Sequence, residues 1–171
     1  MDWGPTLLTE SKHVVITHAG WMVAAFEFCG ALGAMFGGWL TDRFLGGRAV
    51  RACVVYMAMA GVALFAFWKL PLQSELLTTG LLGAAGFFVY GPQCLLAVTA
   101  ANLATKRAAA TAIGLTSIFG YASTVLSGWG LGALVQRYGW DAGFAGLIIA
   151  AVIGTLLFIV AWPAKADGYE S

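Results

Sequence analysis

The chain has 171 residues, of which 60% are hydrophobic and only 10% are charged, and its mean hydropathy is +0.84. A soluble protein of this composition would lack the polar side chains needed to cover its surface, so the composition predicts an integral membrane protein with the lipid bilayer as its partner. The formal net charge of +1, from scattered single charges and short loop clusters, excludes nucleic acid as a partner.

Five apolar segments are long enough to cross a bilayer as helices, because about 20 residues span roughly 30 Å of hydrocarbon. They are predicted at residues 19–40, 50–68, 76–104, 108–135 and 144–162. Pro92 is expected to bend the third segment, because proline removes one helical hydrogen bond. The predicted fold is therefore all-α, a multi-pass bundle of about five transmembrane helices.

The basic residues between the segments predict how the chain is oriented. Six lie in the connections of one side, namely Arg43, Arg48, Arg51, Lys106, Arg107 and Lys165. Three lie on the other side, namely Lys12, Lys69 and Arg137. Because cytoplasmic loops carry an excess of Lys and Arg, this bias predicts a cytoplasmic C-terminus and an N-terminus outside.

Glu27 is the one charged residue within the predicted hydrocarbon depth. A carboxylate there costs a few kcal/mol, so it is expected to face the bundle interior, a water-filled cavity or a partner cation. It is either a structural glutamate, protonated or hydrogen-bonded, or part of a transport pathway. Ionisable groups inside membranes usually mark pathways, which favours the second hypothesis.

Small residues recur at helical spacing and predict close contacts between helices. On the first segment, Gly30, Ala34 and Gly38 form one stripe, and Gly33 with Gly37 forms another. Similar pairs occur on the third segment at Gly83 and Gly86 and on the fourth at Gly128 and Gly132. We expect these positions to serve packing and not substrate contact.

The sequence offers little for catalysis. Cys29, Cys53 and Cys94 each lie alone in an apolar run, and neither His13 nor His18 has a second metal-ligating residue at a suitable spacing. No nucleophile elbow, phosphate loop or paired carboxylates occur. We therefore expect no enzyme, no bound metal and no cofactor.

The loop after the first segment combines glycines with charges. Residues 37–43 read GGWLTDR, and two glycines and Arg48 follow. Asp42 can pair with a loop arginine or cap a neighbouring helix, which predicts a conformational latch formed by Gly38, Asp42, Arg43 and Arg48. The alternative is ordinary cytoplasmic positive charge, which accounts for the arginines but not for the glycine pair and the aspartate.

This loop resembles the loop motif that the major facilitator superfamily carries between helices two and three and again between helices eight and nine. Further segments are similar to one of its members, the organophosphate:phosphate antiporter family. They are residues 86–93 (GFFVYGPQ), 106–114 (KRAAATAIG), 119–121 (FGY) and 139–144 (GWDAGF). Residues 2–8 resemble the extracellular end of that family's seventh helix. The resemblance implies that residues 1–171 are part of a C-terminal transporter half, with the five segments as helices eight to twelve.

The family exchanges a small phosphorylated solute for inorganic phosphate by alternating access, with the substrate at the midplane between two halves. In relatives, arginines of the first and seventh helices clamp the phosphate, and both would precede Met1. No Lys or Arg lies deep within a predicted segment here, since Arg51 is the second residue of its segment. The resemblance thus implies that the missing N-terminal transporter half is a partner, and that this chain alone binds a phosphate dianion poorly.

The resemblance also suggests substrate-binding residues. Tyr90 corresponds to the tyrosine before Gly-Pro on helix ten, and Tyr121 to the tyrosine of the Phe-Gly-Tyr segment on helix eleven; each either binds substrate or makes an interhelical hydrogen bond. Thr116 and Ser117 lie within a turn of Tyr121, and Ser117 shares its face, although a structural role is favoured for both. Glu27 matches an acidic position on helix eight, where it hydrogen-bonds near the substrate or pairs with a clamp arginine.

One departure bears on the substrate. Hexose-phosphate carriers of the family place an acidic and a basic residue on helix eleven, where this chain has Ile113 and Thr116. This tilts the prediction toward glycerol-3-phosphate or a phosphoglycerate-like solute. A membrane sensor of sugar phosphate with the same fold and an inactive five-helix remnant remain as alternatives, and a bacterial inner membrane is the expected location.

Overall fold

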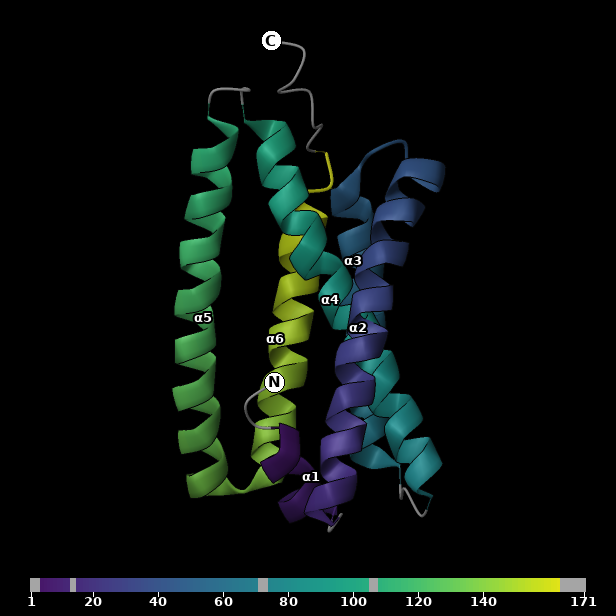
Figure 1. Cartoon of the computed structure of the whole chain (residues 1–171). Coiled ribbons are helices and arrows are strands. Elements are labelled where there is room, and N and C mark those ends of the chain that lie inside the picture. Colours follow the sequence, from purple (N-terminus) through teal and green to yellow (C-terminus); the bar gives the residue numbers. More distant parts are fainter. Residues whose placement is uncertain (1–3, 13–14, 71–73, 105–107, 164–171) are drawn as a thin grey trace.

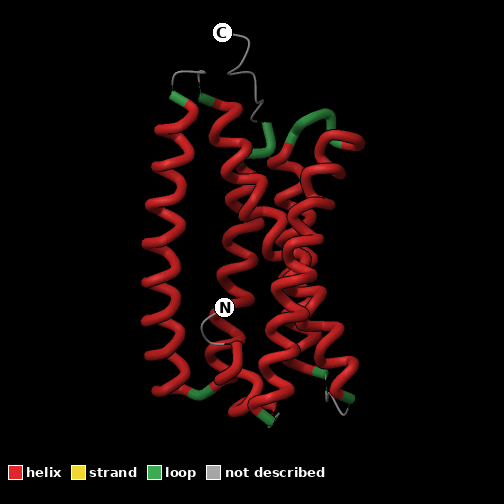
Figure 2. The backbone as a smooth tube through the Cα atoms, in the orientation of Figure 1, coloured by secondary structure: helices red, strands yellow, loops and turns green. Residues whose placement is uncertain are grey.

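The computed structural model describes residues 4–12, 15–70, 74–104 and 108–163 (Figure 1). Every regular element in these ranges is a helix (Figure 2). The helices are α1 (Gly4–Lys12), α2 (Ile16–Phe44), α3 (Ala49–Lys69), α4 (Glu75–Leu103), α5 (Ala109–Tyr138) and α6 (Trp140–Val160). All but α1 are long and apolar enough to cross a membrane. The predicted all-α bundle with five spans is confirmed.

Four of the spans, α2, α3, α5 and α6, are longer than the sequence predicts, whereas α4 has the predicted length. Helices α2 and α4 have 29 residues each, or about 43 Å at 1.5 Å per residue, which exceeds the thickness of the hydrocarbon layer. The predicted connection over residues 136–143 is wrong, because Gly139 alone separates α5 from α6. Its φ of +81° is in the left-handed region, which glycine adopts without strain. The chain therefore reverses direction at a single residue.

The described basic residues are divided between the two ends of the bundle. Arg43, Arg48 and Arg51 lie where α2 ends and α3 begins, whereas Lys12, Lys69 and Arg137 lie at or near the ends of α1, α3 and α5, at the opposite end (Figure 1). His13, Lys106, Arg107 and Lys165 lie outside the described residues, as do residues 2 and 3 of the segment that resembles helix seven. Which end is cytoplasmic remains a prediction from the charge bias.

Helices α2 and α4 form the most extensive contact, α3 packs on α4 and α6, and α5 stands at one edge against α4 and α6 (Figure 1). Buried side chains of α1, α2, α3, α4 and α6 form the main core cluster. At the end where α2 begins, two indoles tie helices together. Trp68 Nε1 donates to Asp141 Oδ1 at 2.7 Å, and Trp140 Nε1 donates to Glu10 Oε2 at 3.0 Å.

Glycines allow α2 and α4 to touch backbone to backbone. A Cβ atom at Gly33 would lie 2.0 Å from the carbonyl oxygen of Phe87, and one at Gly86 would lie 2.3 Å from that of Phe26. The buried glycines of α2 are Gly30, Gly33 and Gly37. The predicted stripe through Gly38 is therefore wrong, since a Cβ at Gly38 would meet nothing within 4 Å. The real stripe follows the i, i+3, i+7 spacing of one helix face.

This contact predicts opposite outcomes for two alanine substitutions on one helix. Gly33→Ala places a methyl group against a backbone oxygen that cannot move independently, and should lower the free energy of unfolding by about 1–3 kcal/mol. Gly38→Ala should change it by less than about 0.5 kcal/mol. Unfolding by detergent titration measures both. Equal effects of the two substitutions would contradict the close α2–α4 approach.

Candidate functional site

The structure brings together two of the predicted site residues, Glu27 of α2 and Tyr90 of α4. The Tyr90 hydroxyl donates a hydrogen bond to Glu27 Oε2, and both side chains are half-buried. Phe26 meets the Tyr90 ring edge to face, with ring centroids 6.0 Å apart. Gly30 makes room for that ring, because a Cβ there would lie 2.7 Å from Tyr90 Cδ2. The pair is built into the α2–α4 contact.

This arrangement accounts for a carboxylate within the spans. A hydroxyl from the adjacent helix donates a hydrogen bond to the Glu27 carboxylate. This bond offsets part of the cost of placing a carboxylate within the membrane. Chemically, the pair can accept hydrogen bonds from a polyol through the carboxylate, and it can donate one to a phosphate if the Tyr90 hydroxyl turns away from Glu27. It has no positive charge of its own to attract a phosphate dianion.

The three predicted site residues on α5 lie apart from this pair. Tyr121 has 76% of its surface exposed. Thr116 Oγ1 donates to the carbonyls of Ala112 at 3.1 Å and Ile113 at 2.8 Å. Ser117 Oγ likewise donates to Ile113 O at 2.9 Å. These two hydroxyls serve the helix backbone, and no hydrogen bond between described residues joins the α5 set to Glu27 or Tyr90.

Three of the predicted latch residues, Asp42, Arg43 and Arg48, lie around the connection between α2 and α3. Asp42 and Arg43 are exposed, and none of the salt bridges between described residues joins Asp42 to Arg43 or Arg48. Arg48 precedes α3 without a side-chain cap. The backbone conformation of this loop explains its two glycines, because Gly46 and Gly47 have φ of +57° and +74°. The Gly47 N–H donates to the carbonyl of Thr41 at 3.1 Å.

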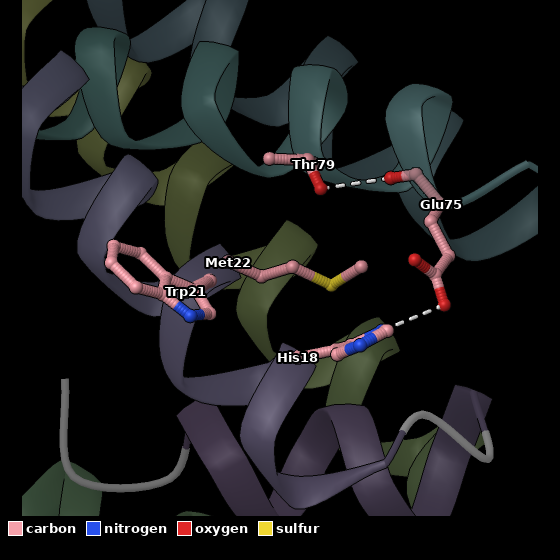
Figure 3. A pocket seen from close by; sticks show the side chains of 5 residues that line it. All are labelled: His18, Trp21, Met22, Glu75 and Thr79. Atoms are coloured by element: carbon pink, nitrogen blue, oxygen red, sulfur yellow. Dashed lines mark hydrogen bonds and ion pairs between the residues drawn. The ribbon is translucent and has the colours of Figure 1, made fainter.

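Sequence reasoning missed a second polar contact between the same two helices. Near the starts of α2 and α4, His18 Nδ1 lies 2.9 Å from Glu75 Oε1. The two residues line an open pocket of about 250 Å³ together with Trp21, Met22 and Thr79 (Figure 3). The signal in the sequence was that both residues fall at the same end of predicted spans. His18 is about 13 Å along α2 from Glu27, and neither Glu27 nor Tyr90 lines the pocket.

A model of the Major Facilitator Superfamily matches residues 3–169. The chain belongs to this superfamily. Among its curated relatives are a glycerol-3-phosphate transporter of Bacillus subtilis, 34% identical over 95% of this chain, and a probable hexose phosphate transport protein of Chlamydia pneumoniae, 34% identical over 99%. The membrane sensor protein UhpC of Salmonella typhimurium is 32% identical over 92%.

These relatives confirm the predicted resemblance to organophosphate carriers. The chain spans 37%, 38% and 36% of the lengths of these three relatives, respectively. Transporters and a sensor match it at almost equal identity, so identity does not separate those two functions. None of the names is that of an enzyme.

The Glu27–Tyr90 contact predicts a measurable loss for Tyr90→Phe. Removing the hydroxyl leaves the carboxylate without this donor, which should lower the free energy of unfolding by about 1–2 kcal/mol, the scale of interhelical hydrogen bonds in membranes. Tyr121→Phe is the matched control, because the Tyr121 hydroxyl has no hydrogen-bond partner among the described residues. Detergent unfolding should leave that control within about 0.5 kcal/mol of the wild type. The same loss in both variants would argue against the contact.

Proposed function

We propose that this chain is the C-terminal part of a secondary transporter, from the end of helix seven to helix twelve, that exchanges a small organophosphate for inorganic phosphate by alternating access. The observation that carries the proposal is the Glu27–Tyr90 pair between two closely packed apolar helices. The chain belongs to the Major Facilitator Superfamily, and its relatives include proteins named as transporters of glycerol-3-phosphate and hexose phosphate.

The negative charge of a phosphate substrate requires cations that the described part of this chain does not place at mid-span. A phosphate dianion in a low-dielectric site requires cations with several donors, ideally arginines. Every described Lys or Arg lies at or near a helix end and none lies at mid-span. The missing N-terminal half is therefore proposed to supply the cations, while Glu27 and Tyr90 contact the organic part of the solute or its phosphate ester oxygen.

Helix α5 is the proposed surface for that half. Gly132 is the only buried residue of this helix, and Tyr121 and Trp129 are 76% and 77% exposed. Tyr121, Thr116 and Ser117 reach the substrate only if a partner half closes over this face. The serine and threonine hydroxyls then fix helix geometry, and Tyr121 remains as the donor.

The latch loop is proposed to change partners during transport. Asp42 is exposed, and no ion pair between described residues joins it to Arg43 or Arg48. It is proposed to engage a group presented by another conformation or by the missing half. Gly38 has open space around it and is proposed to let another helix approach α2 closely at that point. The end of the bundle that carries this loop is proposed to face the cytoplasm of a bacterial cell.

The first experiment determines whether a longer polypeptide exists. An antibody against the segment 164–171, used on membranes of the source organism, should detect a species two to three times the 17.9 kDa of this chain. That species, purified into liposomes, should exchange external glycerol-3-phosphate for internal phosphate. Saturable binding without exchange would indicate the sensor alternative, and a band at the mass of the chain would indicate a five-helix remnant.

Asp42→Asn separates the latch from the binding site. In the full-length parent this change should slow turnover roughly tenfold, a loss of about 1.4 kcal/mol of transition-state stabilisation, with little change in substrate affinity. Tyr121→Phe should instead weaken binding. Initial rates and binding measured on the same preparations report both quantities. Equal losses of affinity in the two variants would contradict this division of roles.

A further inference from the structure

Tyr56 of α3 is one of the largest fully buried side chains of the described structure, with 2% of its surface exposed. Its hydroxyl donates to the carbonyl oxygen of Gly33 in α2 at 3.2 Å. Its ring stacks on Phe87 of α4, with centroids 5.9 Å apart and planes at 16°, and meets Phe88 edge to face at 5.7 Å. One side chain of α3 therefore contacts both helices that carry the Glu27–Tyr90 pair.

The glycines around Tyr56 show how closely it fits. A Cβ at Gly91 would lie 2.1 Å from Tyr56 Cδ1, and one at Gly37 would lie 3.5 Å from the Tyr56 hydroxyl. The ring thus occupies space that any larger residue at Gly91 would fill. Such close packing leaves the ring little freedom to move.

The segment of α4 against Tyr56 is the one that contains the predicted bend. Pro92 lies inside α4, and because it has no N–H, the carbonyl of Phe88 loses its usual helical donor. Tyr90 lies within this weakened turn. Tyr56 contacts Phe87, Phe88 and Gly91, so it supports the turn on both sides of Tyr90 in the sequence.

We propose that Tyr56 is a positioning residue that acts through Tyr90. Its ring holds the turn before Pro92 in the position from which the Tyr90 hydroxyl reaches Glu27. Its own hydroxyl, bonded to the carbonyl of Gly33, fixes α2 relative to that turn. The effect of Tyr56 on transport rests on the proposed function. Its effect on the Glu27–Tyr90 hydrogen bond does not, and the two are tested separately.

The first test reads the hydrogen bond directly by infrared spectroscopy of the full-length parent in nanodiscs. The band of the Glu27 carboxyl group is the one that disappears in Glu27→Gln, and Tyr90→Phe should shift it. Tyr56→Leu, which removes the ring support, should shift it in the same direction. Tyr56→Phe keeps the ring and should restore most of the wild-type position.

Phe67→Leu is the matched control. Phe67 is an equally buried aromatic of α3 at 1% exposure, and its ring packs on Phe144 of α6, with centroids 5.9 Å apart. Its loss should lower stability without moving the Glu27 band. A band unmoved by Tyr56→Leu, or moved equally by Phe67→Leu, would overturn the proposal. If Tyr56→Leu does not fold, Gly91→Ala, which pushes on the same ring, takes its place, and a wild-type band in Gly91→Ala would overturn it.

The second test is a double-mutant cycle on binding of glycerol-3-phosphate by the parent. Tyr56→Leu should weaken binding roughly tenfold alone and cause no further loss in a Tyr90→Phe background, because coupled residues are not additive. Additive losses would mean that Tyr56 supports the fold generally, and would overturn the proposal. If the parent binds no organophosphate at all, the proposed function fails, and the infrared test still decides the role of Tyr56.

Discussion

The backbone contact between α2 and α4 is the constraint on which the rest of the structure depends. In lipid there is no hydrophobic force to press helices together, so association relies on close van der Waals contact and interhelical hydrogen bonds. Gly33 and Gly86 remove the side chains that would keep the two backbones apart. The close approach places Tyr90 against Glu27 and leaves a space between the helices that Tyr56 fills.

A carboxyl group among apolar helices is costly unless its surroundings compensate for the lost water. Here part of the compensation comes from a neighbouring helix, since Tyr90 donates to Glu27. A hydroxyl partner is easier to exchange than a buried arginine, because breaking it leaves no uncompensated positive charge.

The exposed face of α5 contrasts with this well-packed pair. A transmembrane helix with a single buried residue gains little from its neighbours, and its serine and threonine hydroxyls bond to its own backbone, as they do where no other partner is present. Such a helix is consistent with a surface that lipid or another set of helices covers. The three α5 residues predicted for substrate binding belong to that surface and not to the Glu27–Tyr90 pair.

The sequence by itself determined the membrane class, the five spans and the unusual position of Glu27, because hydrocarbon excludes charge and demands long apolar helices irrespective of how those helices pack. It also pointed to Tyr90 through a family resemblance. Only the tertiary structure decided that Gly33 and not Gly38 faces α4, that His18 meets Glu75, and that Tyr56 supports the Pro92 turn. These contacts depend on the rotation and crossing of each helix about its neighbours, which side-chain periodicity specifies weakly when every face of a helix is apolar.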